Sequence, residues 1–356
     1  MAGDCNGPAV SGRGRGGWVI VRAMTALTTP PTGADPPAAS RGRLPQLSAG
    51  RAGGVLLLLI ALPCFLTLPW SLNRYDAQRI GGGPAAAGAM GQEVAMQNQP
   101  PSWSEPMGTD DLGRSLLWRC LLGGAISLGI GGCAAMIAVG IGVAWGLSSG
   151  YAGGKVDAVM MRVVDVLYGL PYILLVVMIT LALQPLLLGL VSGGLGTNDT
   201  VATNAAGVAT LLVAIGGVSW LTMSRVVRGQ VLSLRAQPFI EATRAVGVSP
   251  LRVMAVHLLP NLVGVIVVYA TLAVPLAILQ ESFLSFLGIG VRLPLPSWGN
   301  LAADGVRQLP ALVTPGARVY WWLLVFPCAL LGLTLMALNF LGDAMRERFD
   351  PKRTPR

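Results

Sequence analysis

Six apolar runs, each long enough to cross a bilayer, divide this 356-residue chain, and none of them contains an Asp, Glu, Lys, Arg or His. An α-helix that rises about 1.5 Å per residue needs roughly 20 residues to cross the hydrocarbon core. Ionisable groups at membrane depth are costly, so runs without them favour membrane helices. We therefore expect an all-α integral membrane protein with about six transmembrane helices, at residues 53–70, 121–147, 166–190, 205–223, 262–280 and 320–341.

Composition argues against a soluble protein. Only 12% of the residues are charged, against about 25% in a typical soluble domain, so much of the surface must face lipid. The formal net charge is +9, but the basic residues lie between the apolar runs, where they set membrane topology. They form no patch of the kind that binds nucleic acid. We expect the lipid bilayer, and no nucleic acid, as a partner.

The sequence gives no sign of an enzyme. The chain has five cysteines without a C-x-x-C pair, and Cys64, Cys133 and Cys328 lie within apolar runs, where cysteine behaves as a small hydrophobic side chain. No paired carboxylates, metal ligands or Ser/His constellation lie at membrane depth. We expect no catalytic residue, no metal and no cofactor.

The distribution of basic residues predicts the orientation. With the N-terminus inside, the inner segments hold 18 Lys and Arg residues and the outer segments hold 7. The positive-inside rule then places both termini in the cytoplasm. We predict a disordered cytoplasmic tail (1–50), a first transmembrane helix with a periplasmic segment (51–115), a core of five transmembrane helices (116–343) and a cytoplasmic C-terminal tail (344–356).

The energy for transport must come from elsewhere. The apolar runs carry no ionisable group for an ion relay, although backbone carbonyls can bind sodium. No phosphate-binding G-x-x-x-x-G-K-[ST] loop occurs, because Gly154-Lys155 is followed by Val156. A partner protein is the expected energy source, and a self-sufficient secondary transporter remains the alternative class.

The cytoplasmic segment 224–261 carries the strongest functional signal. Pro238 is placed to start a short helix, and Gly247 fits the left-handed position that ends one. Ser249-Pro250 then starts a second helix, which Pro260 is expected to end. We expect Phe239-Ile240 to be exposed together, and exposed apolar pairs mark contact surfaces more often than solvated helices.

The same segment resembles the signature E-A-A-x-x-x-G-x9-I-x-L-P of binding-protein-dependent ABC transporter permeases. The matching residues are Glu241-Ala242-Thr243, Gly247 and Leu259-Pro260. Thr243 replaces an alanine and His257 replaces the isoleucine. The peptide branch of the family commonly has His, an apolar residue and then Leu-Pro-Asn, as the run His257-Leu258-Leu259-Pro260-Asn261 does.

Further motifs resemble the C-type permease of dipeptide, oligopeptide and nickel importers. They are Gly108-Thr109-Asp110-Asp111-Leu112-Gly113-Arg114, a stretch at 150–165, Glu281-Ser282-Phe283-Leu284-Ser285-Phe286-Leu287-Gly288 and Pro296-Ser297-Trp298-Gly299. Ser115 replaces a common Asp. The resemblance covers about 51–350, and its motifs are specific for the family but not for the solute.

The resemblance implies a type I ABC importer permease fold in the inner membrane, forming half of a pathway for peptides or similar small solutes. It implies a second homologous permease, two cytoplasmic ATP-binding subunits and an extracytoplasmic solute-binding protein as partners. Nickel or another small solute is the alternative. The resemblance also implies an ATPase-coupling loop with the site residues Phe239, Ile240, Glu241, Ala242, Thr243, Ala245, Gly247, Leu259 and Pro260.

Two features stay open from the sequence. Gly142, Gly146 and Gly150 form a stripe of small residues that suits ordinary helix packing, contact with a partner permease or the pore. The outer segment 288–300, which contains Trp298, suits contact with the binding protein or an interfacial aromatic anchor.

A pair of inner-face carboxylates is also open. Asp157 and Asp165 lie near Lys155 and Arg162 in the sequence. We expect interface or solvated charges there rather than catalytic carboxylates.

Overall fold

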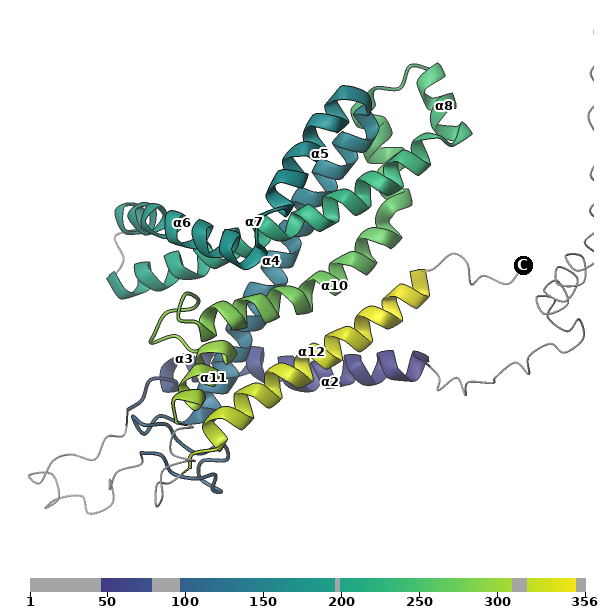
Figure 1. Cartoon of the computed structure of the whole chain (residues 1–356). Helices are drawn as coiled ribbons and strands as arrows, with labels where there is room; N and C mark the ends of the chain where they lie inside the picture. The colour runs from purple at the N-terminus through teal and green to yellow at the C-terminus, as the bar shows by residue number, and fades with distance from the viewer. Residues whose placement is uncertain (1–45, 79–96, 196–198, 309–318, 350–356) are drawn as a thin grey trace, which may run out of the picture. The chain divides into compact units, whose positions relative to one another are not determined.

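The computed structural model describes residues 46–78, 97–195, 199–308 and 319–349, and in this part of the chain it holds helices and no strand (Figure 1). Five helices are long and apolar enough to cross a membrane, and a bent pair near the start would make a sixth span. The all-α membrane architecture is thereby confirmed. The five are α4 (Leu116–Ala152), α6 (Tyr172–Leu195), α7 (Asp199–Arg235), α10 (Leu259–Phe286) and α12 (Trp322–Phe349).

The first predicted span is not straight. It consists of α2 (Gln46–Leu66) and α3 (Leu68–Arg74), whose axes differ by 60° across a break at Thr67. Pro69 lies in the first turn of α3, where a residue without an N–H interrupts the helical ladder that would join the two helices. The hydroxyl of Thr67 donates to the carbonyl oxygen of Pro63 at 2.6 Å, which gives the polar side chain a partner at the bend.

A second break divides the predicted span 166–190. Helix α5 (Gly154–Tyr168) ends there, and α6 begins only at Tyr172. Pro171 explains the break, since proline removes a backbone donor and disfavours helical geometry in the residue before it. The range predicted from hydropathy alone is therefore wrong at its start, because an apolar run continues through the turn.

Helices α4, α7, α10 and α12 are longer than the apolar runs and include charged residues. Helix α10 continues to Phe286 and contains Glu281, whose side chain is fully buried. The hydroxyl of Ser285 donates to Glu281 Oε1 at 2.7 Å. The predicted run 262–280 holds no ionisable residue, and it stops one residue short of this carboxylate in the same helix.

The most extensive helix pair is α4 with α7, and its glycine stripe lies inside the chain. A Cβ on Gly142 would lie 2.5 Å from Met223 Cβ, and one on Gly150 would lie 2.8 Å from Val231 Cβ. Glycine lets the two backbones approach closely. Of the alternatives left open by the sequence, ordinary helix packing is the one observed.

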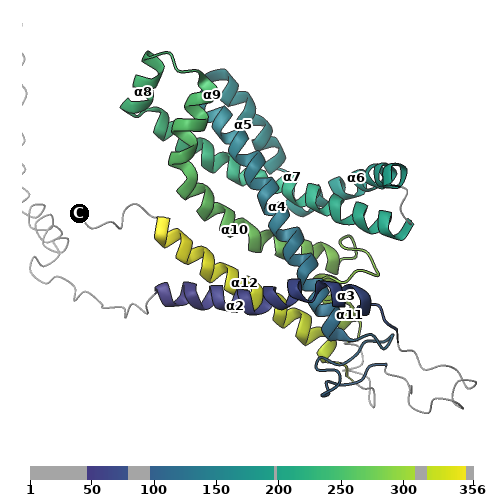
Figure 2. The same cartoon turned by 180° about the vertical axis from the view of Figure 1, so that it is seen from behind.

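Figures 1 and 2 show from opposite sides that α8 (Pro238–Ala245) and α9 (Pro250–Arg252) lie at one end of the long helices, and that α3 and α11 (Trp298–Arg307) lie at the other end. The start of α2 lies beside the end of α12, where a Cβ on Gly50 would come within 2.2 Å of Ala344 Cβ. At the other end, the short helix α11 packs on α12 and α10. The predicted tails fall largely outside the described residues, although α2 already begins at Gln46 and α12 continues to Phe349.

Candidate functional site, the helical loop between α7 and α10

The segment between α7 and α10 contains helix α8 (Pro238–Ala245) and helix α9 (Pro250–Arg252), so the predicted pair of short helices is confirmed. Helix α9 passes through a π-helical turn (Val253–Leu258) directly into α10. Pro260 lies in the first turn of α10 and does not end a helix as expected. Because the helix is continuous here, Pro260 leaves one hydrogen bond to the preceding turn unmade, and the π-helical turn lies directly before it.

Gly247 ends α8 in the predicted left-handed conformation, with φ of 80°. Its N–H donates to the carbonyl of Arg244 at 3.0 Å, and the N–H of Val248 donates to the carbonyl of Thr243 at 3.1 Å. These two bonds form a Schellman motif, which satisfies the last carbonyls of the helix. A side chain at this position would be strained, so glycine fixes where the chain turns toward α9.

The two apolar residues at the start of α8 point in different directions. Ile240 is fully buried, whereas 42% of Phe239 is exposed. Ile240 packs in a cluster that includes Val231 of α7, Val253 of the π-helical turn and Leu262 of α10. The expectation that both side chains are exposed is therefore wrong for Ile240, because one face of this short helix must bury an apolar side chain to be held in place.

A second contact holds α8 against the end of α4. The guanidinium carbon of Arg244 lies 4.8 Å from the centre of the Tyr151 ring, a distance at which a cation and an aromatic ring attract each other. Among the described residues, no ion pair joins Arg244 to Glu241, although the i, i+3 spacing would allow one. Arg244 therefore connects α8 to the end of α4 and makes no ion pair within its own helix.

The remaining predicted site residues divide into an outer and an inner set. Thr243 and Leu259 are half-buried, and Leu259 packs against the same apolar cluster as Ile240. The outer set forms what we term the α8 surface, to which Val246 adds an apolar side chain that is 82% exposed. The α8 surface comprises Phe239, Glu241, Ala242, Ala245, Val246 and Gly247. Pro260 is exposed at the start of α10.

Beside this loop, Asp157 of α5 is buried and bound by Arg228 of α7 through both guanidinium nitrogens that face it. The Ser149 hydroxyl of α4 donates to the same carboxylate. The hydrogen bonds from Arg228 hold the pKa of Asp157 below its ordinary value, against the opposing effect of burial. Asp157 therefore pairs with Arg228 and not with its sequence neighbour Lys155. A side chain on the same short helix cannot contact the face of α5 that α7 covers.

Asp165 of α5 also pairs with an arginine of α7, at a more exposed position. Its carboxylate accepts a hydrogen bond from Arg225 of α7 at 2.9 Å, and the side chains of Arg225 and Asp165 are 39% and 57% exposed. Arg225 also lies over the ring of Tyr168, with 4.1 Å between the guanidinium carbon and the ring centre.

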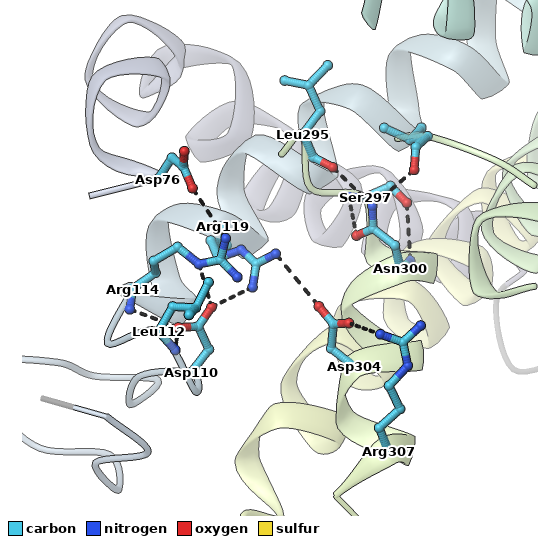
Figure 3. Close-up of polar contacts among 11 residues, drawn as sticks. Asp76, Asp110, Leu112, Arg114, Arg119, Leu295, Ser297, Asn300, Asp304 and Arg307 are labelled. Carbon is cyan, nitrogen blue, oxygen red and sulfur yellow. Dashed lines mark hydrogen bonds and ion pairs between the residues drawn. The ribbon is translucent and has the colours of Figure 1, made fainter. Parts of the chain in front are cut away.

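The opposite end of the molecule contains a buried ion network that sequence reasoning missed (Figure 3). Asp110 Oδ2 accepts hydrogen bonds from Arg114 Nε and from Arg119 Nη1, each at 2.7 Å. Arg119 is 1% exposed, and its Nη2 lies 3.7 Å from Asp304 of α11. Burial raises the pKa of Asp304, while the charges of Arg119 and Arg307 oppose that shift. Two signals were available in the sequence, namely the motif that contains Asp110 and Arg114, and an arginine, Arg119, at the edge of an apolar run.

Trp298 proves to be an internal side chain. It is fully buried, and its indole Nε1 donates to the carbonyl of Cys120 at 3.0 Å. Its backbone N–H points to the hydroxyl of Ser127 at 3.3 Å. Both sequence alternatives, an interfacial anchor and a contact with a binding protein, are therefore wrong for this residue. It joins α11 to α4, and the Ser297 side chain caps α11 together with Asn300 (Figure 3).

Comparison with known proteins gives a consistent result. Residues 142–355 match the family described as binding-protein-dependent transport system inner membrane component. The chain is 40% identical to the dipeptide transport system permease protein DppC of Bacillus subtilis, over 73% of each chain. It is 40% identical to the oligopeptide transport system permease protein OppC of Escherichia coli K12, over 88% of this chain and 90% of that one. The corresponding protein of Salmonella typhimurium is 45% identical over the same shares.

Among solved structures, the inward-facing MetNI methionine ABC transporter has a similar chain. The match covers 66% of this chain and 98% of that one, with a TM-score of 0.47 and 17% identity.

Proposed function

Since the chain belongs to the family of binding-protein-dependent transport system inner membrane components, we propose that it forms half of the translocation pathway for di- and oligopeptides in an ATP-driven importer. The chain is a permease of the inner membrane, with apolar helices of spanning length. The peptide solute is inferred from relatives whose names describe dipeptide and oligopeptide transport.

The α8 surface is the observation that carries the coupling role. It offers Phe239 and Val246 to a partner, while Ile240 beneath it is fixed in the apolar cluster of α7 and α10. Exposed apolar side chains next to small residues suit insertion into a groove of another protein. We assign that groove to a cytoplasmic ATP-binding subunit.

The buried side of α8 supports a mechanical role. Ile240, the Arg244–Tyr151 contact and the Schellman turn at Gly247 tie α8 to α4, α7 and α10. The Asp157–Arg228 pair adds α5 to the same assembly. A displacement of α8 by closing ATPases would therefore move these helices together, and such rigid-body motion is how packed helices switch between two states. No covalent chemistry is assigned to this chain.

The remaining partners and the orientation complete the proposal. A second homologous permease, two ATP-binding subunits and a solute-binding protein on the outer side would form the importer. The excess of basic residues near α8 and near both termini supports a cytoplasmic location for that end of the molecule. The network around Arg119 would then lie on the outer side.

Purification of the chain in mild detergent, with mass spectrometry of its partners, tests the proposal. We expect a second permease and ATP-binding subunits to co-purify. In vesicles, Glu241→Arg and Gly247→Asp should abolish ATP-driven peptide uptake. Asp343→Arg, which makes the same charge reversal as Glu241→Arg at an exposed position of α12, should leave uptake unchanged. Unimpaired uptake by both loop variants would refute the coupling role.

Two alternatives give different results in the same preparation. Uptake of nickel but not of peptides would leave the permease role and change the solute. Transport by the isolated chain, driven by a proton or sodium gradient, would indicate a secondary transporter and contradict the coupling loop.

A further inference from the structure

A cavity of about 530 Å³ lies among the membrane helices, away from the α8 surface and from the network of Arg119. Its walls come from α4, α6, α7 and α10 and from the end of α5. Tyr168 and Leu276 on its rim are about half exposed, so this chain alone does not close the cavity. A volume of this size falls in the range of about 300–1,000 Å³ that small-molecule sites occupy.

Three polar side chains from three helices meet in this cavity. The hydroxyl of Tyr172 on α6 lies 3.1 Å from Ser219 Oγ on α7 and donates to Gln280 Oε1 on α10 at 2.5 Å. Gln280 Oε1 accepts this bond, whereas the –NH₂ group of Gln280 makes no hydrogen bond within the described residues. The cluster therefore offers one unused donor group to an occupant, beside the hydroxyls of Tyr172 and Ser219.

Lipid is a poor occupant for such a surface. Polar side chains that face hydrocarbon lose hydrogen bonds to water, so within membrane proteins they face other helices or an aqueous path. The break between α5 and α6 also borders the cavity, because Leu167, Leu170 and Tyr172 line it. Non-helical backbone at membrane depth is tolerated where it lines a cavity or is covered by protein. Two independent features thus favour a water-filled path at this place.

The lining also restricts the chemistry of the solute. It contains no Asp, Glu, Lys, Arg, His or Cys, and no group of three or more metal-binding side chains occurs in the described ranges. Hydroxyl and amide groups match the donors and acceptors of a peptide bond, and a neutral apolar wall accepts varied uncharged side chains. Divalent metal ions prefer carboxylate, imidazole or thiolate ligands, which are missing from this lining.

We propose that this cavity is a solute-contact site in the translocation pathway, where Tyr172, Ser219 and Gln280 bind the peptide groups of the passing solute. The inference rests on the proposed function and extends it by assigning the contact residues and by favouring peptides over nickel. The half-exposed rim implies that the second permease supplies the missing wall.

Initial uptake rates of radiolabelled tri-alanine by the complete importer in proteoliposomes test this site. Loss of one neutral hydrogen bond at a contact that controls passage should lower the rate about tenfold in Gln280→Leu. Gln184→Leu is the matched control, since Gln184 lies on the neighbouring α6 outside the cavity. The control should transport at the wild-type rate, and both variants should retain their ATP-binding subunits.

A second variant guards against a folding defect in Gln280→Leu. Ser219→Cys replaces one hydroxyl by a thiol of similar size, and a polar thiosulfonate reagent should block its tri-alanine uptake while leaving the wild type active. Tri-alanine should slow that modification at least severalfold.

Wild-type uptake by Gln280→Leu, or modification of Ser219→Cys at a rate that tri-alanine does not change, would overturn the inference and leave the proposed function intact. If the wild-type importer transports nickel and no peptide, the peptide assignment fails and this inference fails with it.

Discussion

Arg228 and Asp157 are 71 residues apart and form a two-pronged ion pair, with Nε 2.6 Å from Oδ1 and Nη2 2.5 Å from Oδ2. The pair joins α7 to α5 next to the loop that carries α8. A comparable pair, Arg225 with Asp165, joins the same two helices in a more exposed place. The two pairs provide a matched experiment on the effect of burial.

Asp157→Asn should lower the stability of the detergent-solubilised chain by about 1.5–3 kcal/mol, the range for hydrogen bonds to charged groups. Asp165→Asn should change it by about 1 kcal/mol or less, because solvent screens the exposed pair. Thermal unfolding of the two variants in one detergent compares them. Equal losses would show that the buried pair has no special role.

The same pair predicts a pH dependence. Arg228 holds the folded-state pKa of Asp157 below its ordinary value of 3.8, so the carboxylate stabilises the fold above that pH. This contribution is lost as the pH falls from 3.8 through the lowered pKa, because the unfolded chain binds the proton first. The difference in melting temperature between wild type and Asp157→Asn should persist from pH 7 to about pH 4 and narrow below it. A difference that vanishes near pH 6 would implicate another group.

Arg119→Met should destabilise the chain by about 3–5 kcal/mol, because it removes one partner from a buried charge network and leaves Asp110 with less compensation. Arg307→Met should cost about 1 kcal/mol or less, since this side chain is 72% exposed. Fluorescence-detected size-exclusion after heating measures both. A mild effect of Arg119→Met would mean that the apolar replacement packs as well as the ion pair.

Gly146→Ala should disturb the pairing of α4 with α7. Its Cβ would lie 2.6 Å from the carbonyl oxygen of Ser224 and 2.8 Å from Val227 Cβ, and overpacking of this kind costs about 1–3 kcal/mol. Gly140→Ala meets nothing within 4 Å and should be neutral or slightly stabilising, because alanine is the better helix former. The melting temperatures of the two variants test this prediction. A lower melting temperature for Gly140→Ala than for Gly146→Ala would contradict the observed packing.

The two apolar residues at the start of α8 should have separable roles. Ile240→Ala removes a fully buried side chain and should lower stability by about 2–4 kcal/mol. Phe239→Ala should leave the melting temperature nearly unchanged but reduce the amount of ATP-binding subunit that co-purifies. Normal co-purification with Phe239→Ala would remove this residue from the proposed contact surface.

The membrane class, about six apolar runs of spanning length and the family could all be predicted from the amino-acid sequence. These properties depend on hydropathy over some twenty residues and on short motifs, which are local and need no partner across the fold. Local geometry in the loop was also predictable, since Pro238 and Gly247 act through their own backbone restrictions at the start and end of α8.

Which side chains meet could not be predicted and follows from the packing of the helices. Ile240 and Trp298 are buried, although we expected both at a surface, and Asp157 pairs with Arg228 rather than with its sequence neighbours. The packing also assembles the Tyr172, Ser219 and Gln280 cluster from three helices and includes the buried Glu281 in α10. Such contacts depend on the relative rotation and depth of packed helices, which the interlocking of side chains from distant segments sets and which no local pattern encodes.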